Sequence, residues 1–556
     1  MKKAMPPKTD VLDNIEVWCT KHQKWLITGI MCTFTLFSLL LFNLRVSEGG
    51  DDSTYIIRAV KFINNGMYPS FQGPLYPLFL SVFVALFGIK LSILKASSFA
   101  VMLLSVWMFY KFFRKRISYT LLFAMLLLTS VSSYYIYFTS QTYSEALFIF
   151  LQLPIFALVY AVYEDGKEGL NWPRMVLLSA FILAGFLTRT VGIGALLAVI
   201  TFFIFVKRYK EAAVVAGGFM VLLVLSLALK SAIWQIGWFD GGQASTLLYK
   251  HPYQLDKGRE TFGGFVMRFI DNSNLYLSKH FLKMVALRPD GINKINGSLT
   301  LLLYGIFAFS AFKAYKKDKY FAFIIIYLGI MLSITFVVLQ KLWDQYRLIV
   351  PFFPYMILVM LYGLNHLGRS LRSKWPRYLF MTLVGLAILN SAYRSFTKAD
   401  LLTLRKNMKG DLYEGYSDDW RNYLSMAEYA SKALPDDCLA AARKPNMAQV
   451  YGNGRRFYGI YRYDTEDPDK LLARLKENNV THVIMASLRK NPVINNGLTI
   501  NTVQRYLYII AKKYPQIFKL EHQIGGKVEP AYLFRVDYKA VHAINSTLPK
   551  ANNIKE

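Results

Sequence analysis

The chain has 556 residues, of which 54% are hydrophobic and 16% aromatic, and its mean hydropathy is +0.29. These values exclude an ordinary soluble protein, because the apolar residues come in blocks of about 20, the length that crosses a bilayer as a helix. The formal net charge of +30 would suggest nucleic acid in a soluble protein. Here much of the basic excess lies in short loops between apolar blocks and no nucleic-acid motif is present, so the composition indicates a polytopic membrane protein that does not bind nucleic acid.

The apolar blocks predict about eleven membrane spans, with about thirteen as the upper limit. The first block, Trp25–Leu44, follows basic residues and lacks a small-residue cleavage site, so we expect a retained span rather than a signal peptide. The later blocks are Leu91–Phe112, Tyr119–Val131, Tyr143–Val162, Met175–Leu187, Val191–Val206, Ala212–Ile236, Ser298–Phe312, Tyr320–Leu339, Ile349–Leu367 and Tyr378–Tyr393.

Clusters of Lys and Arg occur at every second connection, within residues 111–116, 207–210, 313–319 and 369–377. Positive charge favours the cytoplasmic side, which places the N-terminus and these clusters there. The apolar segment Pro74–Phe87 is short for a span, and every later cluster would change sides if it crossed. We therefore expect it to be re-entrant or juxtamembrane, on the outer face.

The first outer loop, residues 45–90, carries the adjacent carboxylates Asp51 and Asp52 ahead of an amphipathic helix that Gly66 should end. Such a helix should lie along the membrane surface. Its apolar residues fall at i, i+3, i+4 and i+7, namely Ile56, Ala59, Val60 and Ile63. A carboxylate here either caps the helix or accepts a proton from a hydroxyl group, and capping needs only one of the two.

The connection Tyr134–Glu145 contains no Lys or Arg and ends with Glu145 at the start of a span. A carboxylate at that depth is costly and therefore a functional candidate, although a hydrogen bond to Ser144 or Tyr143 would also explain it.

Isolated cations on the outer side also need an explanation, because the charge rule keeps most of them inside. Lys95, Arg189 and Arg347 could bind a phosphate, the arginines by bidentate hydrogen bonds. The alternative is an ion pair, for instance between Arg347 and Asp344.

Two regions lie outside the spans, a long outer loop at residues 237–297 and a soluble C-terminal region. We expect two domains. Residues 1–396 form a membrane module that includes the outer loops 45–90 and 237–297, and residues 397–556 form a soluble α/β domain. In the latter, periodicity predicts helices at Asp418–Ala433, Asp469–Asn478 and Gln504–Lys513 and strands at Cys438–Ala442, Val480–Met485 and Ala531–Val536.

Four places together carry a resemblance to a known family: DDSTY from Asp51 with Ala59 and Gly66, GPLYPLFLSVFVALFG followed by SILKASS, YSEALF, and LTRTVGIG with YRLIVPFFP. In their order, spacing and sidedness, over about residues 25–395, the chain resembles GT-C fold glycosyltransferases of the protein O-mannosyltransferase and aminoarabinose-transferase-like group (families 39 and 83).

The resemblance implies an enzyme that moves a sugar from a polyprenyl-phosphate donor in the membrane lipid to an acceptor lipid, glycan or protein. Asp51 corresponds to the family's catalytic base, Asp52 stands where Glu is usual, and Glu145 matches the second acidic position. Lys95 stands where Arg is frequent, and Arg347 matches a basic residue before the last spans. The full set of expected site residues is Asp51, Asp52 and Glu145 for catalysis, Arg58, Lys95, Arg189 and Arg347 for the donor phosphate, and Tyr55, Tyr346 and His251 for substrate binding.

The chain lacks the His-Pro-Pro and the β-trefoil insertion of eukaryotic protein mannosyltransferases. We therefore expect a bacterial protein of the cytoplasmic (inner) membrane, with its active site and C-terminal domain on the periplasmic side. No cofactor is indicated; a divalent metal is compatible with the carboxylates, but no ligand spacing demands one. The alternative functions are a transporter or flippase of lipid-linked sugars, which usually shows internal repeats and broken spans, and a structural partner, which leaves the carboxylates unexplained.

Overall fold

The computed structural model describes residues 10–71, 73–166, 170–238, 240, 247–252, 254–341, 343–371, 373–489 and 498–540. They form two compact units. The first unit comprises Met1–Phe42, Gly66–Phe79 and Ser92–Leu401, and the second comprises Asn43–Asn65, Leu80–Leu91 and Leu402–Glu556. The first outer loop thus contributes to both units, whereas the domain boundaries at 396 and 397 stay a prediction.

Among the described residues, eight helical segments of the first unit are long and apolar enough to cross a membrane. They are α2 (Gln23–Leu40), α5 (Leu91–Phe113), α8 (Ser144–Glu164), α11 (Tyr209–Trp234), α15 (Gly297–Lys317), α16 (Lys319–Val338), Val350–Ser370, which contains α17 (Phe353–Ser370), and α18 (Trp375–Thr397). A ninth is formed if α6 (Tyr119–Val131) continues through a 66° bend into α7 (Ser133–Ile136) and η1 (Tyr137–Ser140). The shorter apolar helices α9 (Trp172–Thr188) and α10 (Ile193–Phe205), the latter preceded by η2 (Thr190–Gly192), match the remaining two predicted blocks.

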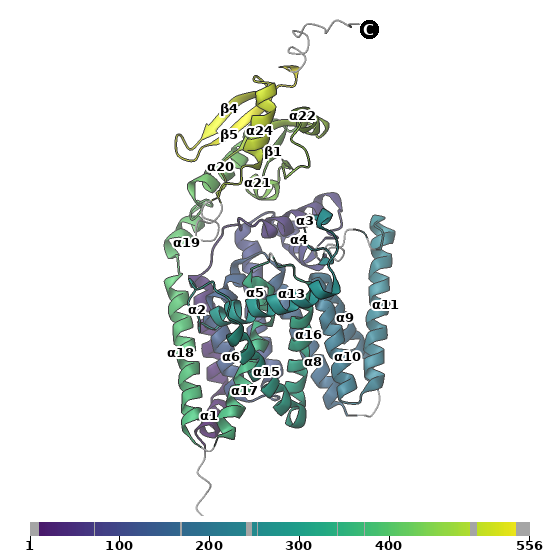
Figure 1. Ribbon diagram of the computed structural model, residues 1–556, viewed down its shortest axis with the longest axis vertical. Coiled ribbons are helices and arrows are strands. Elements are labelled where there is room, and N and C mark those ends of the chain that lie inside the picture. Colours follow the sequence, from purple (N-terminus) through teal and green to yellow (C-terminus); the bar gives the residue numbers. More distant parts are fainter. Residues whose placement is uncertain are drawn as a thin grey trace, which may run out of the picture. The chain divides into compact units, whose positions relative to one another are not determined.

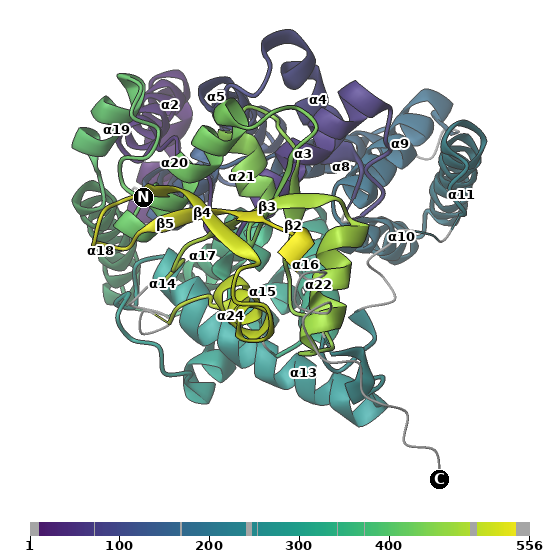
Figure 2. The ribbon, with the colours of Figure 1, turned by 90° about the horizontal axis from the view of Figure 1, so that it is seen from above.

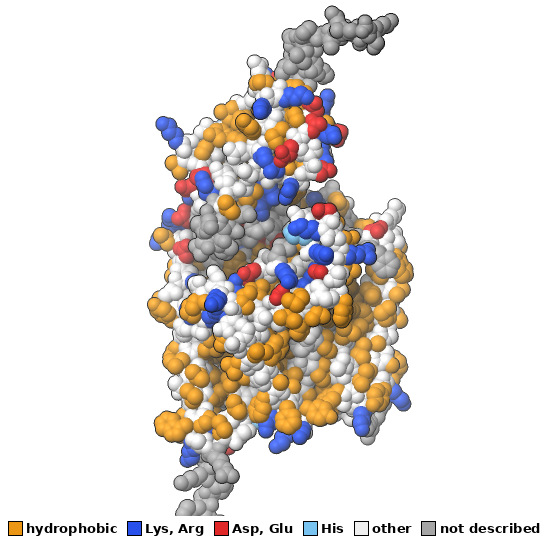
Figure 3. Space-filling view, viewed as in Figure 1, with side chains coloured by type: hydrophobic (Ala, Val, Ile, Leu, Met, Phe, Trp, Pro, Cys, Tyr) orange, Lys and Arg blue, Asp and Glu red, His pale blue; other side chains and the backbone are white. Residues whose placement is uncertain are grey.

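The helices of the first unit pack side by side, with α8 on α9, α9 and α10 on α11, and α10 on α16 (Figure 1). Helices satisfy their own backbone hydrogen bonds, which is required where no water is present. Hydrophobic side chains cover the flank of these helices in Figure 3, and leucines such as Leu225 and Leu229 on α11 are more than half exposed. Such a surface suits contact with lipid.

The basic connections meet at one end of the first unit. Arg116 lies 2.6 Å from Glu164, so the end of α5 lies against the end of α8. Arg208, before α11, donates to the carbonyl of Val162 in α8, and Arg369 of α17 lies 2.7 Å from Asp13 of α1 (Val11–Lys21). The charge alternation therefore corresponds to one real end of the helices, and assigning that end to the cytoplasm stays a prediction.

Two helices follow the first span, α3 (Asp51–Asn65) and α4 (Leu75–Phe87). Gly66 ends α3 with a φ of +65°, as predicted, and Ile56, Ala59 and Val60 are buried. Ile63, the last residue of the predicted apolar face, is 42% exposed. α4 has 13 residues and is about 20 Å long, less than the hydrocarbon thickness of about 30 Å.

The second unit contains a five-stranded sheet in the order β2-β1-β3-β5-β4. The strands are β1 (Leu439–Ala442), β2 (Phe457–Gly459), β3 (Val480–Met485), β4 (Phe518–Ile524) and β5 (Ala531–Val536). β1 pairs in parallel with β2 and β3, whereas β5 is antiparallel to β3 and β4. Three of these strands were predicted, and β2 and β4 were not.

Helices cover both faces of this sheet. In Figure 2, α20 (Asp418–Ala433) and α21 (Pro445–Tyr451) lie on one side and α22 (Pro468–Glu477) and α24 (Thr502–Lys513) on the other. Leucines of α22 and residues Val503, Leu507 and Ile510 of α24 share a core with Val480 and Val483 of β3. α22 begins as its sequence favours, because Asp467 caps it by accepting from Asp469 N and Pro468 occupies the first turn. The predicted α/β domain is confirmed, with α19 (Leu401–Met408) and α21 as additional helices.

Candidate active site

Glu145 lies at the N-terminus of α8 and is completely buried in the first unit. Its Oε1 atom is 2.6 Å from Arg189 Nη1 and 3.1 Å from Arg347 Nε. Arg189 ends α9, and Arg347 lies in η5 (Tyr346–Leu348), so three separate segments supply the cluster. Oε2 of Glu145 is buried, and no described residue donates a hydrogen bond to it.

The connection before Glu145 is held by α5. Lys95 is completely buried, and its Nζ donates to the carbonyl of Ser140 at 2.6 Å. Ser98 Oγ, one turn later, donates to the carbonyl of Gln141 at 2.7 Å. Lys95 therefore supports the backbone that leads to Glu145.

These contacts bear on two alternatives that the sequence left open. Glu145 pairs with two arginines, and the ring of Tyr143 lies 4.6 Å beneath the Arg347 guanidinium. Arg347 is in an ion pair, as the alternative expected, and Glu145 is a partner in it.

Asp344 pairs with a lysine and a histidine that were not among the expected site residues. Its carboxylate lies 2.6 Å from His280 Nε2 and 2.5 Å from Lys279 Nζ. These two residues lie in a π-helical turn, η4 (Tyr276–Phe281), between α13 (Phe262–Leu275) and α14 (Leu282–Met284). The hydrogen bonds from His280 and Lys279 hold the pKa of Asp344 well below its usual range, and burial lowers the pKa of His280. The preference for positive charge on the cytoplasmic side could have drawn attention to Lys279 and His280, because they lie in the predicted outer loop.

Tyr346 joins the Glu145 cluster through its aromatic neighbours. Its ring centroid lies 4.8 Å from that of Tyr134 and 6.2 Å from that of Phe138, both in the connection that ends at Glu145. Aromatic rings at these distances and tilts make favourable edge-to-face contacts. They fix η5, and with it Arg347, against that connection.

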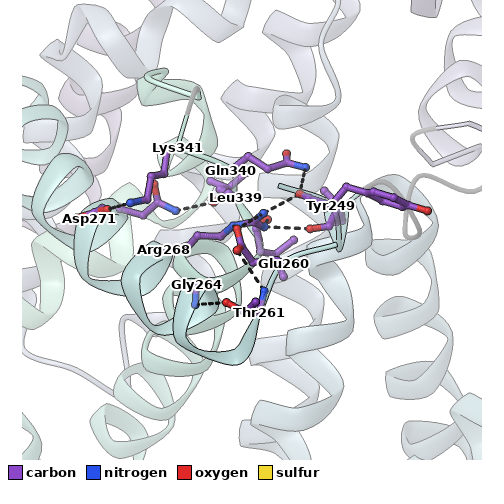
Figure 4. A network of polar contacts seen from close by, with 12 residues as sticks. Tyr249, Glu260, Thr261, Gly264, Arg268, Asp271, Leu339, Gln340 and Lys341 are labelled. Atoms are coloured by element: carbon purple, nitrogen blue, oxygen red, sulfur yellow. Dashed lines mark hydrogen bonds and ion pairs between the residues drawn. The ribbon is translucent and has the colours of Figure 1, made fainter. Parts of the chain in front are cut away.

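His251 is half-buried in the loop 237–297, whose described part is anchored by Arg268. As Figure 4 shows, Arg268 pairs with Glu260 at 2.9 Å and donates to the carbonyl of Tyr249 at 2.7 Å. It also donates to the carbonyl of Val338 at the end of α16, at 3.3 Å. This buried cation therefore fastens the loop to a membrane-spanning helix.

In the second unit, Asp51 and Asp52 open α3. Asp52 is completely buried, and its carboxylate accepts from Ser47 N at 2.7 Å and from Ser53 N at 2.8 Å. Asp51, the first helical residue, is half-buried. Asp52 therefore closes the turn before the helix, a structural use that the sequence suggested for one of the pair.

The strand of chain before this turn is held by tyrosines of the C-terminal region. Tyr416 donates from its hydroxyl to the carbonyl of Val46, and its oxygen lies 3.0 Å from the hydroxyl of Tyr451. On α3, Tyr55 is 4% exposed and Arg58 is half-buried, and burial lowers the pKa of Arg58. Apart from His251, the expected site residues thus lie in two groups, one around Glu145 in the first unit and one along α3 in the second.

The described residues do not fit a metal-ion site. No three His, Cys, Asp or Glu residues in the described part of the chain come together as ligands. Glu145 is engaged by two cations, and both oxygens of Asp52 accept from backbone amides. We therefore derive no step through a metal.

No protein-family model and no curated protein sequence matches this chain. Solved structures are similar at low identity. ArnT from Cupriavidus metallidurans, bound to undecaprenyl phosphate, aligns with a TM-score of 0.54 and 12% identity over 93% of this chain and 99% of its own. An oligosaccharyltransferase from Archaeoglobus fulgidus, in complex with zinc and sulfate, aligns with a TM-score of 0.54 and 12% identity over 91% of this chain and 72% of its own. The same enzyme tethered to an acceptor peptide aligns with a TM-score of 0.50 and 11% identity over 93% and 74%. The chain is therefore a multi-pass membrane protein with the GT-C fold.

Proposed function

We propose that the protein transfers a sugar from a polyprenyl-phosphate-linked donor to an acceptor lipid, glycan or protein on the outer face of a bacterial cytoplasmic membrane. The observation that carries the proposal is the buried cluster of one carboxylate and two guanidiniums, Glu145 with Arg189 and Arg347. The fold supports it, because ArnT with this fold was solved bound to undecaprenyl phosphate and another such protein is an oligosaccharyltransferase.

The two guanidiniums of the cluster are suited to an anionic ligand. Arg189 and Arg347 share the carboxylate of Glu145, and their side chains are only 15% and 19% exposed. A guanidinium has five N–H donors in a planar fork, so contact with Glu145 is compatible with bidentate donation to a phosphate.

In the proposed reaction the acceptor hydroxyl attacks the anomeric carbon while Asp51 takes its proton. The bond from the anomeric carbon to the phosphate oxygen breaks, and the polyprenyl phosphate leaves with the electron pair. Arg189 and Arg347 stabilise the charge that develops on it. We assign the base to Asp51 because the carboxylate of Asp52 is buried on backbone amides. Glu145 orients the two guanidiniums.

The experiment compares Asp51→Asn with Asp418→Asn. Asp418 is a matched control, because it also begins a helix as the first of two adjacent aspartates and is exposed. Mass spectrometry of lipids, glycans and proteins from cells with and without the protein identifies the glycosylated product. We expect product formation to fall by about 10²–10⁴-fold in Asp51→Asn and to persist in Asp418→Asn. Undiminished product from correctly folded Asp51→Asn would contradict the role of Asp51 as base, and identical glycosylation with and without the protein would contradict the proposed function.

A further inference from the structure

The turn after β1 contacts the backbone just before Asp51. Lys444 follows this strand, and its Nζ donates to the carbonyl of Glu48 at 2.8 Å and to that of Gly49 at 3.2 Å. The backbone of Lys444 is itself fixed by Tyr423 on α20, whose hydroxyl donates to the Lys444 carbonyl at 3.1 Å. Tyr423 is 1% exposed, so the lysine extends from a rigid part of the sheet layer.

Asn446, two residues after Lys444, contacts the same turn through Thr54. Asn446 Nδ2 donates to Thr54 Oγ1 at 2.9 Å, and Thr54 Oγ1 donates to the carbonyl of Gly50 at 2.8 Å. Gly50 directly precedes Asp51 and has a φ of +87°, a conformation that side-chain-bearing residues rarely adopt. Lys444 therefore holds the carbonyls of Glu48 and Gly49 directly, and Asn446 acts on the Gly50 carbonyl through the hydroxyl of Thr54.

We propose that Lys444, assisted by Asn446, is a positioning residue for sugar transfer: it fixes the turn at residues 47–50 and thereby sets the direction of the Asp51 carboxylate. This inference rests on the proposed function and deepens it, because it gives the C-terminal domain a part in the reaction. A displacement of about 1 Å in a reacting group can reduce turnover by about a hundredfold, so holding this turn has a direct kinetic consequence.

The charge of Lys444 makes the contact sensitive to pH. Burial is the largest cause that lowers its pKa to about 8, with Arg443 acting in the same direction and Asp51, Glu48 and Asp52 opposing it. The ammonium form therefore predominates below pH 8 and is lost as the pH rises through that value. Loss of the charge weakens both the bonds to the two carbonyls and the attraction of the three carboxylates.

The test measures initial rates of product formation in membrane vesicles that contain the full chain and its endogenous donor, from pH 6 to 10. We expect wild-type turnover to fall as the pH passes about 8, and Lys444→Met to be slower by about tenfold to a hundredfold at pH 7. Lys444→Arg should remain active and lose the decline near pH 8, because arginine stays protonated. Lys432→Met is the matched control, since Lys432 is 73% exposed in its pair with Glu428 on α20, and it should behave as wild type.

A second readout covers the case in which Lys444→Met does not fold. Asn446→Ala retains the lysine, and we expect it to be several-fold slower and to accelerate hydrogen exchange of the amides in residues 47–55. Wild-type rates, pH profile and amide exchange in Lys444→Met, or a decline at the same pH in Lys444→Arg, would overturn the inference. If vesicles with and without the protein form the same product, the proposed function fails. If Asp51→Asn retains full transfer, the role of Asp51 as base fails; if only the Lys444 and Asn446 variants retain it, this inference alone fails.

Discussion

Replacing Glu145 by Gln removes the negative charge from a completely buried site and keeps its shape. The change leaves Arg189 and Arg347, 2.6 Å and 3.1 Å from Oε1, without their shared counter-charge. Breaking a buried ion pair from one side costs about 3–5 kcal/mol, because the remaining charge stays away from water. An exposed pair contributes only about 0–1 kcal/mol. Asp165→Asn is the matched control, since Asp165 pairs with Arg174 and both side chains are about one third exposed.

The assay is thermal unfolding of the purified full chain in lipid nanodiscs. One kcal/mol shifts the Tm by about 2–4 °C in domains of 150–250 residues and by less in a longer chain, so we expect Glu145→Gln to lower the Tm by at least about 3 °C more than Asp165→Asn. The double variant Glu145→Gln/Arg189→Gln should recover part of the loss, because one excess cation is removed. Equal Tm values for Glu145→Gln and Asp165→Asn would refute the reasoning that Glu145 is the counter-charge of a buried arginine cluster.

The remaining predictions concern two other positions of the first unit. Gly73 has a φ of +90°, and a Cβ there would lie 2.4 Å from the carbonyl oxygen of Thr188. Gly73→Ala should therefore destabilise the protein by more than about 2 kcal/mol and lower both its Tm and the yield of folded protein. Gly29→Ala is the control and should change neither, because a Cβ at Gly29 would meet nothing within 4 Å. Asp344 has a lowered pKa, so its contribution to stability is present at neutral pH and is lost as the pH falls below about 4. Asp344→Asn should therefore lower the Tm at pH 7 and reduce the further decrease of Tm between pH 6 and pH 3; a pH dependence equal to that of wild type would contradict this.

The spans could be predicted from the sequence because their cause is local. A block of about 20 apolar residues must form a helix in lipid, since no other arrangement satisfies its backbone within one segment. α6 (Tyr119–Val131) begins and ends where its block does, and α5 extends its block by one residue. Even the short α9 and α10 were visible as blocks.

Only part of the candidate site could be predicted from the sequence. The free-energy cost of burying a charge can be judged from its own segment, whereas the identity of its ion-pair partner depends on the fold. Glu145 could be identified alone, since a carboxylate at the start of a span is expensive. Its partner Arg347 is 202 residues away, and proximity in sequence favoured Asp344 instead. The structure shows that Asp344 binds Lys279 and His280, residues of a π-helical turn that carries no simple periodic pattern.

In the soluble domain, too, features with a local sequence pattern could be predicted and features that depend on distant contacts could not. Strands β3 and β5 were predicted because they are apolar and largely buried, with Val483 and Leu533 as examples. β4 is an edge strand with Lys519 and Glu521 on its exposed side, so its pattern resembles a surface loop. Lys444 could not be identified at all, since its function depends on a turn 396 residues earlier in the chain.

The most direct test of sugar transfer is the ratio of glycosylated product formed to polyprenyl phosphate released. Membrane vesicles that contain the protein are analysed by mass spectrometry for glycosylated product and for newly released polyprenyl phosphate, with Asp51→Asn vesicles as the reference. The proposed function predicts that both products accumulate in equal amounts and that neither does so with Asp51→Asn. Movement of the intact lipid-linked sugar across the bilayer, with no polyprenyl phosphate released, would contradict it and indicate a flippase.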